Sequence, residues 1–187
     1  MKKRIVLAVT GASGTIYAAT LAEELGSRDD VELHVVISHA AEKVMQLETD
    51  LSPVDLTSQA HAAYDEHDIA APPASGSWRH AGMIVCPCSM ASLAAIANGL
   101  GNNLIHRAAD VCLKEGMPLV LVPRETPLSE IHLQNMLAAR RAGAVLLPAC
   151  PGFYHRPRTV GSLAAHVAGK ALDALGVPHR LFTRWGE

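Results

Sequence analysis

Short apolar runs alternate along this chain with longer stretches rich in alanine and leucine. Each run is nearly continuous and does not alternate with polar residues, which is typical of parallel strands buried on both faces. The runs predict strands at 5–10, 31–37, 83–86, 118–122 and 145–147. The stretches between them predict helices at 16–25, 40–47, 90–97, 104–114 and 131–142, and a last helix from about residue 162.

This alternation predicts an α/β fold, in which a doubly wound parallel sheet of the Rossmann-like or flavodoxin-like kind is flanked by helices. The length of 187 residues fits a single domain over 1–187. Ligands of such folds bind beyond the carboxyl ends of the strands, so we expect a site among the loops there. Residues 50–80 show no regular pattern and predict a long loop, either functional or disordered.

Composition excludes several classes of protein. With 49% hydrophobic and 18% charged residues the chain is not disordered, and a net charge of −2 argues against a nucleic-acid partner. No apolar run approaches the 18 residues of a membrane span. The basic start at 2–4 precedes an apolar run too short for a secretory signal. Four cysteines without a disulfide-like framework favour the cytoplasm.

The first candidate motif is Gly11-Ala12-Ser13-Gly14, directly after the first predicted strand. Amides at a helix start, together with the Ser13 hydroxyl, would form an anion site suited to phosphate. The motif lacks the third glycine of the dinucleotide fingerprint, and Ser38 stands where that fingerprint has an acidic residue. A mononucleotide therefore fits better than a dinucleotide, and a tight turn without a ligand remains the alternative.

A second motif, Cys86-Pro87-Cys88-Ser89-Met90-Ala91-Ser92, ends the third predicted strand. Its serines would add hydroxyl donors to the same crevice. The two cysteines are interpreted as small buried hydrophobic residues, because no second Cys/His pair has ligand spacing. The ten histidines show no HxxxH pair and no obvious triad, so we expect no nucleophilic catalysis by them. No metal site is expected.

Basic residues and two carboxylates complete the candidate chemistry. Arg124 lies between Pro123 and Pro127 after a predicted strand, where it could bind phosphate in bidentate fashion. Glu48 and Glu125 are the carboxylates nearest to the predicted crevice, with ordinary salt bridges as the alternative. Because no Asp-rich magnesium motif occurs, we expect cations of the protein to neutralise any phosphate.

Taken together, these segments resemble the UbiX-type flavin prenyltransferases, within the homo-oligomeric flavin-containing cysteine decarboxylase-like proteins. The resemblance covers essentially the whole chain in order. The matching segments are 10–14, 71–77, 86–90, 102–105, 107–111, 114–115, 119–128, 131–133, 135–137, 151–154 and the terminal Arg184-Trp185-Gly186-Glu187.

The resemblance implies that the dimethylallyl group of dimethylallyl phosphate is joined to N5 and C6 of reduced FMN. The product, prenylated FMN, would serve UbiD-type decarboxylases, in ubiquinone biosynthesis or another pathway. The resemblance further implies a homo-oligomer, a dodecamer, in which some site residues are donated across subunit contacts.

Site residues follow from the same resemblance. FMN would be held by Gly11, Ala12, Ser13, Ser38, Ser89, Met90, Ala91, Ser92 and Arg124. The prenyl phosphate would be held by Arg107, Lys114, Glu125, Tyr154, Lys170 and Trp185. The residues implied in catalysis are Glu48, Glu125, Lys114 and Ser13.

One departure and two alternatives qualify this interpretation. Lys170 stands where many relatives have arginine, which would weaken a bidentate grip on phosphate. An FMN-dependent cysteine-type decarboxylase shares the fold, but its PxMNxxMW clamp is missing at 123–127. A non-catalytic flavin carrier would not need Glu125, Lys114 and Tyr154 together.

Overall fold

The computed structural model describes residues 2–186, so Met1 and Glu187, the last residue of the terminal motif, lie outside it. The strands are β1 (Lys3–Val9), β2 (Val31–Ile37), β3 (Ala62–Asp65), β4 (Gly82–Cys88), β5 (Leu119–Pro123) and β6 (Val145–Leu146). The helices are α1 (Thr15–Gly26), α2 (His39–Glu48), α3 (Pro53–Thr57), the 3₁₀ turn η1 (Pro72–Ala74), α4 (Met90–Ala97), α5 (Leu104–Glu115), α6 (Glu130–Arg141) and α7 (Val160–Ala174).

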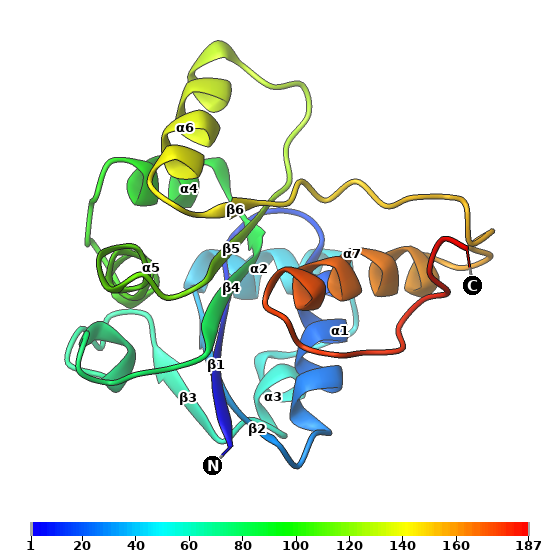
Figure 1. Cartoon of the computed structure of the whole chain (residues 1–187), viewed down its shortest axis with the longest axis horizontal. Helices are drawn as coiled ribbons and strands as arrows, with labels where there is room; N and C mark the ends of the chain where they lie inside the picture. The colour runs from blue at the N-terminus through cyan, green and yellow to red at the C-terminus, as the bar shows by residue number, and fades with distance from the viewer. Residues whose placement is uncertain (1, 187) are drawn as a thin grey trace.

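All six strands form one parallel sheet in the order β3-β2-β1-β4-β5-β6 (Figure 1). The chain begins in the middle of the sheet, winds outward through β2 and β3, and then returns to β4 on the other side of β1. The order of strands therefore reverses between β1 and β4, which is where doubly wound sheets bind ligands. The doubly wound α/β prediction is confirmed.

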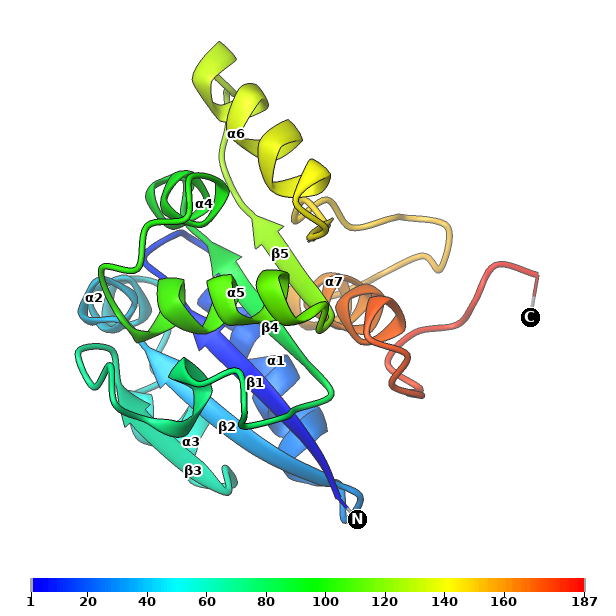
Figure 2. The same cartoon turned by 60° about the vertical axis from the view of Figure 1, so that its left-hand side comes forward.

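The core consists of two apolar layers, one on each face of the sheet. Figure 2 shows the helices that cover the two faces. Ile5, Leu7 and Val9 of β1 pack with α1 and α7, whereas Val6 and Ala8 pack with α4 and α5. Successive residues of a strand point to opposite faces, so a strand covered on both sides must be apolar at nearly every position. Along the described chain no helix is both long and apolar enough to cross a bilayer.

The structure differs from the sequence prediction over residues 50–80. This segment contains α3, the edge strand β3 and η1, so the expected long irregular loop is wrong. Helix α3 has only five residues and begins with Pro53 after the capping Ser52, which is too short to show helical periodicity. Strand β3 is an edge strand of four residues, Ala-Ala-Tyr-Asp, and its apolar stretch is too short to predict a strand.

Candidate functional site

A pocket of about 580 Å³ opens at the carboxyl ends of β1, β2 and β4. Its lining includes five of the residues that the sequence marks for flavin binding, which are Gly11, Ser38, Ser89, Ala91 and Ser92. Small-molecule sites usually occupy 300–1,000 Å³ and combine apolar walls with a few placed polar groups, so this pocket has the expected size. The two serine-bearing motifs, far apart in the sequence, are therefore brought together.

Thr10 joins the two strands that form the floor of the pocket. It is 2% exposed, and its hydroxyl donates to the Pro87 carbonyl oxygen at 2.9 Å. The Thr10 hydroxyl oxygen also accepts the backbone N–H of Ser89 at 2.7 Å. Ser89 in turn caps α4, because its hydroxyl oxygen accepts the Ser92 N–H at 3.1 Å. One buried hydroxyl thus positions the start of α4 against the end of β1.

We expect Thr10→Val to destabilise the fold by about 2–3 kcal/mol, because it orphans the Ser89 amide and removes the bond to Pro87. Urea unfolding measures the loss. Thr10→Ser is the matched control, since it keeps the hydroxyl and should cost less than half as much. Equal losses in the two variants would contradict the prediction, because keeping the hydroxyl would then bring no stability.

The loop after β1 lies against the start of α2. A Cβ atom at Gly11 would lie 2.6 Å from the Cβ of Ala40, so only glycine permits this approach. Ser38 caps α2, and its buried hydroxyl oxygen accepts the Ala41 N–H at 3.1 Å. The Ser38 hydroxyl hydrogen remains available to a ligand.

The start of α1 differs from the expected anion site. A carboxylate oxygen of Glu48 accepts the Gly14 N–H at 2.8 Å and the Thr15 N–H at 3.3 Å. Partial burial by itself would raise the pKa of Glu48, but hydrogen bonds from Ser13, Gly14 and Thr15 outweigh it and lower that pKa. The expectation of free amides is therefore wrong for Gly14, because a carboxylate at the end of α2 already satisfies the helix terminus.

Glu66 is a pocket residue that the sequence does not reveal. It is 9% exposed, and its carboxylate accepts the His39 N–H and an amide N–H of Asn103, both at 2.8 Å. It therefore ties α2 to the start of α5. Next to it, burial lowers the pKa of His106, whose Nε2 lies 3.3 Å from the Ser92 hydroxyl. Glu66 follows β3 in the segment predicted as loop, where no spacing distinguishes it.

The other expected flavin residues lie beside the pocket. Ala12 and Met90 are buried next to lining residues, and Ser13 follows in the same loop. Arg124 is partly buried at the end of β5, and its N–H donates to the Cys88 carbonyl at 3.4 Å. Glu125 is exposed, and its carboxylate accepts the Thr126 N–H at 2.9 Å.

The expected prenyl-phosphate residues do not gather in one chain. Lys114 pairs with Glu115 at the far end of α5. It lies roughly 16 Å along the helix axis from Asn103, at 1.5 Å per residue. Arg107 pairs with Asp110 at 2.7 Å, and Lys170 with Asp173 at 3.7 Å.

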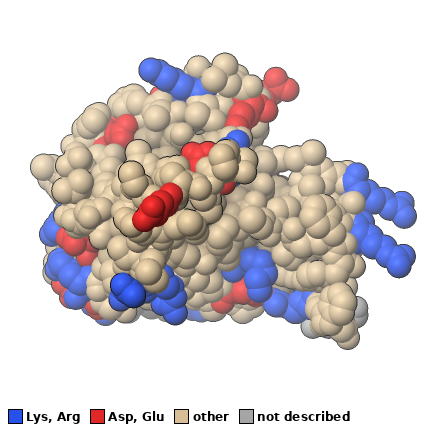
Figure 3. Space-filling model, turned by 90° about the horizontal axis from the view of Figure 1, so that it is seen from above, with Lys and Arg blue, Asp and Glu red and all other residues tan. Residues whose placement is uncertain are grey.

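The aromatic members of that set form a separate group. The Tyr154 and Trp185 rings pack edge to face, with their centroids 5.4 Å apart. The Tyr154 hydroxyl lies 3.3 Å from Nε2 of His166. Figure 3 shows the carboxyl edge from above: most of its atoms belong to uncharged residues, and most basic side chains lie toward its margins. A single chain therefore builds the flavin pocket without the cationic half of the expected site.

A flavoprotein family model matches residues 1–166. The flavin prenyltransferase UbiX of Alkalihalophilus pseudofirmus is 48% identical over 100% of this chain and 98% of its own length. The structure of AnUbiX (PadA1) in complex with FMN and dimethylallyl pyrophosphate superposes with a TM-score of 0.95 at 45% identity, over 100% of this chain and 99% of that one. A second similar structure is that of a dodecameric FMN-dependent UbiX-like decarboxylase from Escherichia coli O157:H7. Its TM-score is also 0.95, and it is 44% identical over 98% of this chain and 100% of its own.

Proposed function

This chain belongs to the UbiX-type flavin prenyltransferase family, and we propose that it transfers the dimethylallyl group of dimethylallyl phosphate to reduced FMN. The observation that carries the proposal is the pocket at the β1–β4 switch point, formed by the motifs that the family shares. The direct test is turnover of reduced FMN with dimethylallyl phosphate, followed by the mass of the flavin product. An unchanged flavin would contradict the proposal.

The residues present fit FMN as the acceptor. The pocket offers hydroxyls of Ser38, Ser89 and Ser92 for the polar part of the flavin, and apolar walls from Ala94 and Ala95. Arg124, directly beyond β5, would supply positive charge for the FMN phosphate. Reduced FMN would supply the nucleophilic N5 and C6 atoms when bound, and the residues of this pocket would hold and orient it.

We propose that the complete site forms between subunits of a homo-oligomer, as in the dodecameric relative. Lys114, Lys170 and Tyr154 lie apart from the flavin pocket in one chain, so a neighbouring copy would have to bring them to it. Helix α6 also exposes three apolar side chains, those of Ile131, Leu133 and Leu137. Burying such a surface against another copy is favourable, and closed symmetric assembly is the common outcome.

Prenylated FMN would pass to a UbiD-type decarboxylase. We place the enzyme in the cytoplasm, because its free cysteines, Cys86, Cys88, Cys112 and Cys150, suit a reducing compartment. Residues 1–187 would act as one flavoprotein domain.

We expect prenyl transfer to proceed without Mg²⁺. Basic side chains would stabilise the departing phosphate, and the chain lacks an Asp-rich magnesium motif. Initial rates with an excess of a chelator should match rates without it. A loss of most activity that added Mg²⁺ restores would contradict this prediction.

A further inference from the structure

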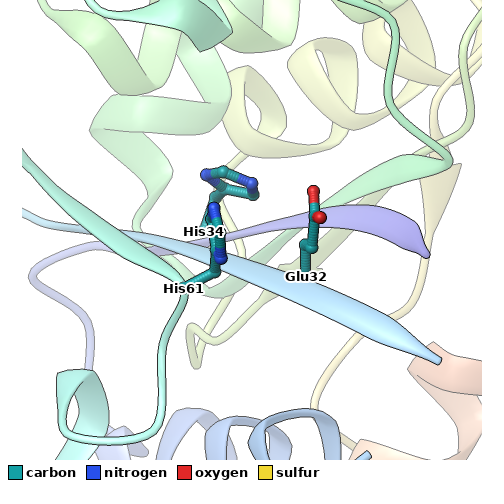
Figure 4. A group of neighbouring side chains, drawn as sticks. All are labelled: Glu32, His34 and His61. Carbon is teal, nitrogen blue, oxygen red and sulfur yellow. The ribbon is translucent and has the colours of Figure 1, made fainter. Parts of the chain in front are cut away.

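Three potential metal ligands meet at the edge of the sheet opposite the flavin pocket (Figure 4). Glu32 and His34 lie two residues apart on β2, so their side chains point to the same face. His61 directly precedes β3, and its N–H donates to the Leu33 carbonyl at 2.8 Å. One ligand atom from each residue lies within 4.8 Å of the other two.

His34 is the buried member of this cluster and has an unused ring nitrogen. The residue is 4% exposed, and its Nε2 has no hydrogen-bond partner among residues 2–186. Its Nδ1 lies 3.0 Å from the Tyr64 hydroxyl. When Nδ1 carries the proton and donates it to Tyr64, Nε2 keeps a lone pair. Metal-binding histidines are commonly oriented in this way, by a hydrogen bond from the ring nitrogen that does not bind the metal.

The side chains of Glu32 and His61 are free to move toward a metal ion bound to His34. One carboxylate oxygen of Glu32 accepts Arg4 Nε at 3.1 Å, and the Glu32 side chain is 26% exposed. His61 is exposed, with its ring centroid 5.3 Å from that of His34. Arg4 is itself 43% exposed, so it can turn toward solvent when a cation binds beside Glu32.

The ligand set, and not the surrounding charge, selects the metal. The hollow beside Glu32 is also lined by Lys2, Lys3, Arg4 and Arg79, whose positive charges disfavour every cation, so an ion must be held by strong ligand bonds. Mg²⁺ and Ca²⁺ prefer oxygen ligands, whereas two imidazoles and one carboxylate suit zinc.

We propose that Glu32, His34 and His61 form a zinc site, with water as the fourth ligand. Tetrahedral ligands about 2.1 Å from zinc lie about 3.4 Å apart, so the three side chains would close by about 1 Å. The ion would link β2 to the edge strand β3. Because it lies at the amino end of β2, it would be remote from the flavin pocket and take no part in transfer.

Zinc titration of the FMN-loaded protein against a chromophoric chelator tests the proposal. We expect one zinc per chain, and His61→Ala and Glu32→Gln should each weaken binding at least tenfold. Both side chains reach solvent, so these variants should fold. His67→Ala is the matched control, because His67 is an exposed histidine in another cluster, with His39 and Glu66. It should leave zinc affinity unchanged.

Ni²⁺ quenching locates the ion independently. The Trp78 ring lies 4.8 Å from the His34 ring, and the chain has only two tryptophans. In a Trp185→Phe background, Ni²⁺ should quench Trp78 fluorescence, and His61→Ala should abolish the quenching at the same concentration. No bound zinc, zinc binding that survives His61→Ala, or an equal loss in His67→Ala would overturn the proposal. Prenyl-transfer rates should stay the same in His61→Ala.

Discussion

Glu125→Gln is expected to lower turnover by about 10²–10⁴-fold, the usual range for a lost general acid–base group. Closing the new ring at C6 requires a proton to leave that carbon. The proton must reach a base within hydrogen-bond distance, either this carboxylate or the departing phosphate. Glu125 follows Arg124 directly beyond the carboxyl end of β5, and its side chain is exposed.

FMN affinity should stay within a few-fold in Glu125→Gln, because Gly11, Ser38, Ser89 and Ser92 still form the pocket. Flavin titration and single-turnover kinetics separate the two effects. Equal losses of FMN affinity and of rate would contradict the catalytic role and support a structural one, in which Glu125 only orients Arg124.

Mixed oligomers are expected to recover activity that neither parent variant has. Lys114→Ala and Glu125→Gln should each be nearly inactive as pure oligomers. If each site takes Lys114 and Glu125 from different subunits, random mixing in equal amounts leaves about a quarter of the sites with both native residues. Co-expression with two different tags, followed by tandem purification and assay, measures this recovery.

The control for mixed oligomers is two differently tagged populations of the same variant, which should remain inactive. Absence of recovery in the mixed sample would place Lys114 and Glu125 in one subunit. Their separation within the described chain would then require a large rearrangement of α5. The experiment therefore distinguishes a shared site from a self-contained one without a structure of the assembly.

The fold could be predicted from the sequence because its central strands are buried on both faces. β2 and α4 match their predicted boundaries, and the other predicted elements are shifted by at most a few residues. The hydrophobic pattern does not predict β3 and α3. An edge strand of four residues and a helix of five contain too few buried apolar residues to show a strand or helix period. Their positions depend on contacts with β2 and α1, which a local pattern does not contain.

The candidate site was predictable to the extent that its residues lie in loops at strand ends. Gly11, Ser38 and Ser89 meet because parallel strands end at a common edge. Glu66 and the His34–His61 pair were not predictable, since both depend on β3 lying beside β2. Glu48 shows another limit: its sequence position suggests a ligand contact, whereas the fold already uses it to cap α1.

The central position of β1 has a consequence for synthesis on the ribosome. β1 can pair with β2 once residue 37 has emerged, but its other neighbour, β4, begins only at residue 82. Until then an apolar strand keeps one edge of unpaired amides and carbonyls, which is the feature that promotes intermolecular strand pairing. The nascent chain is therefore most vulnerable to aggregation over this interval, and the risk falls when β4 covers the edge and also delivers the Pro87 carbonyl to Thr10.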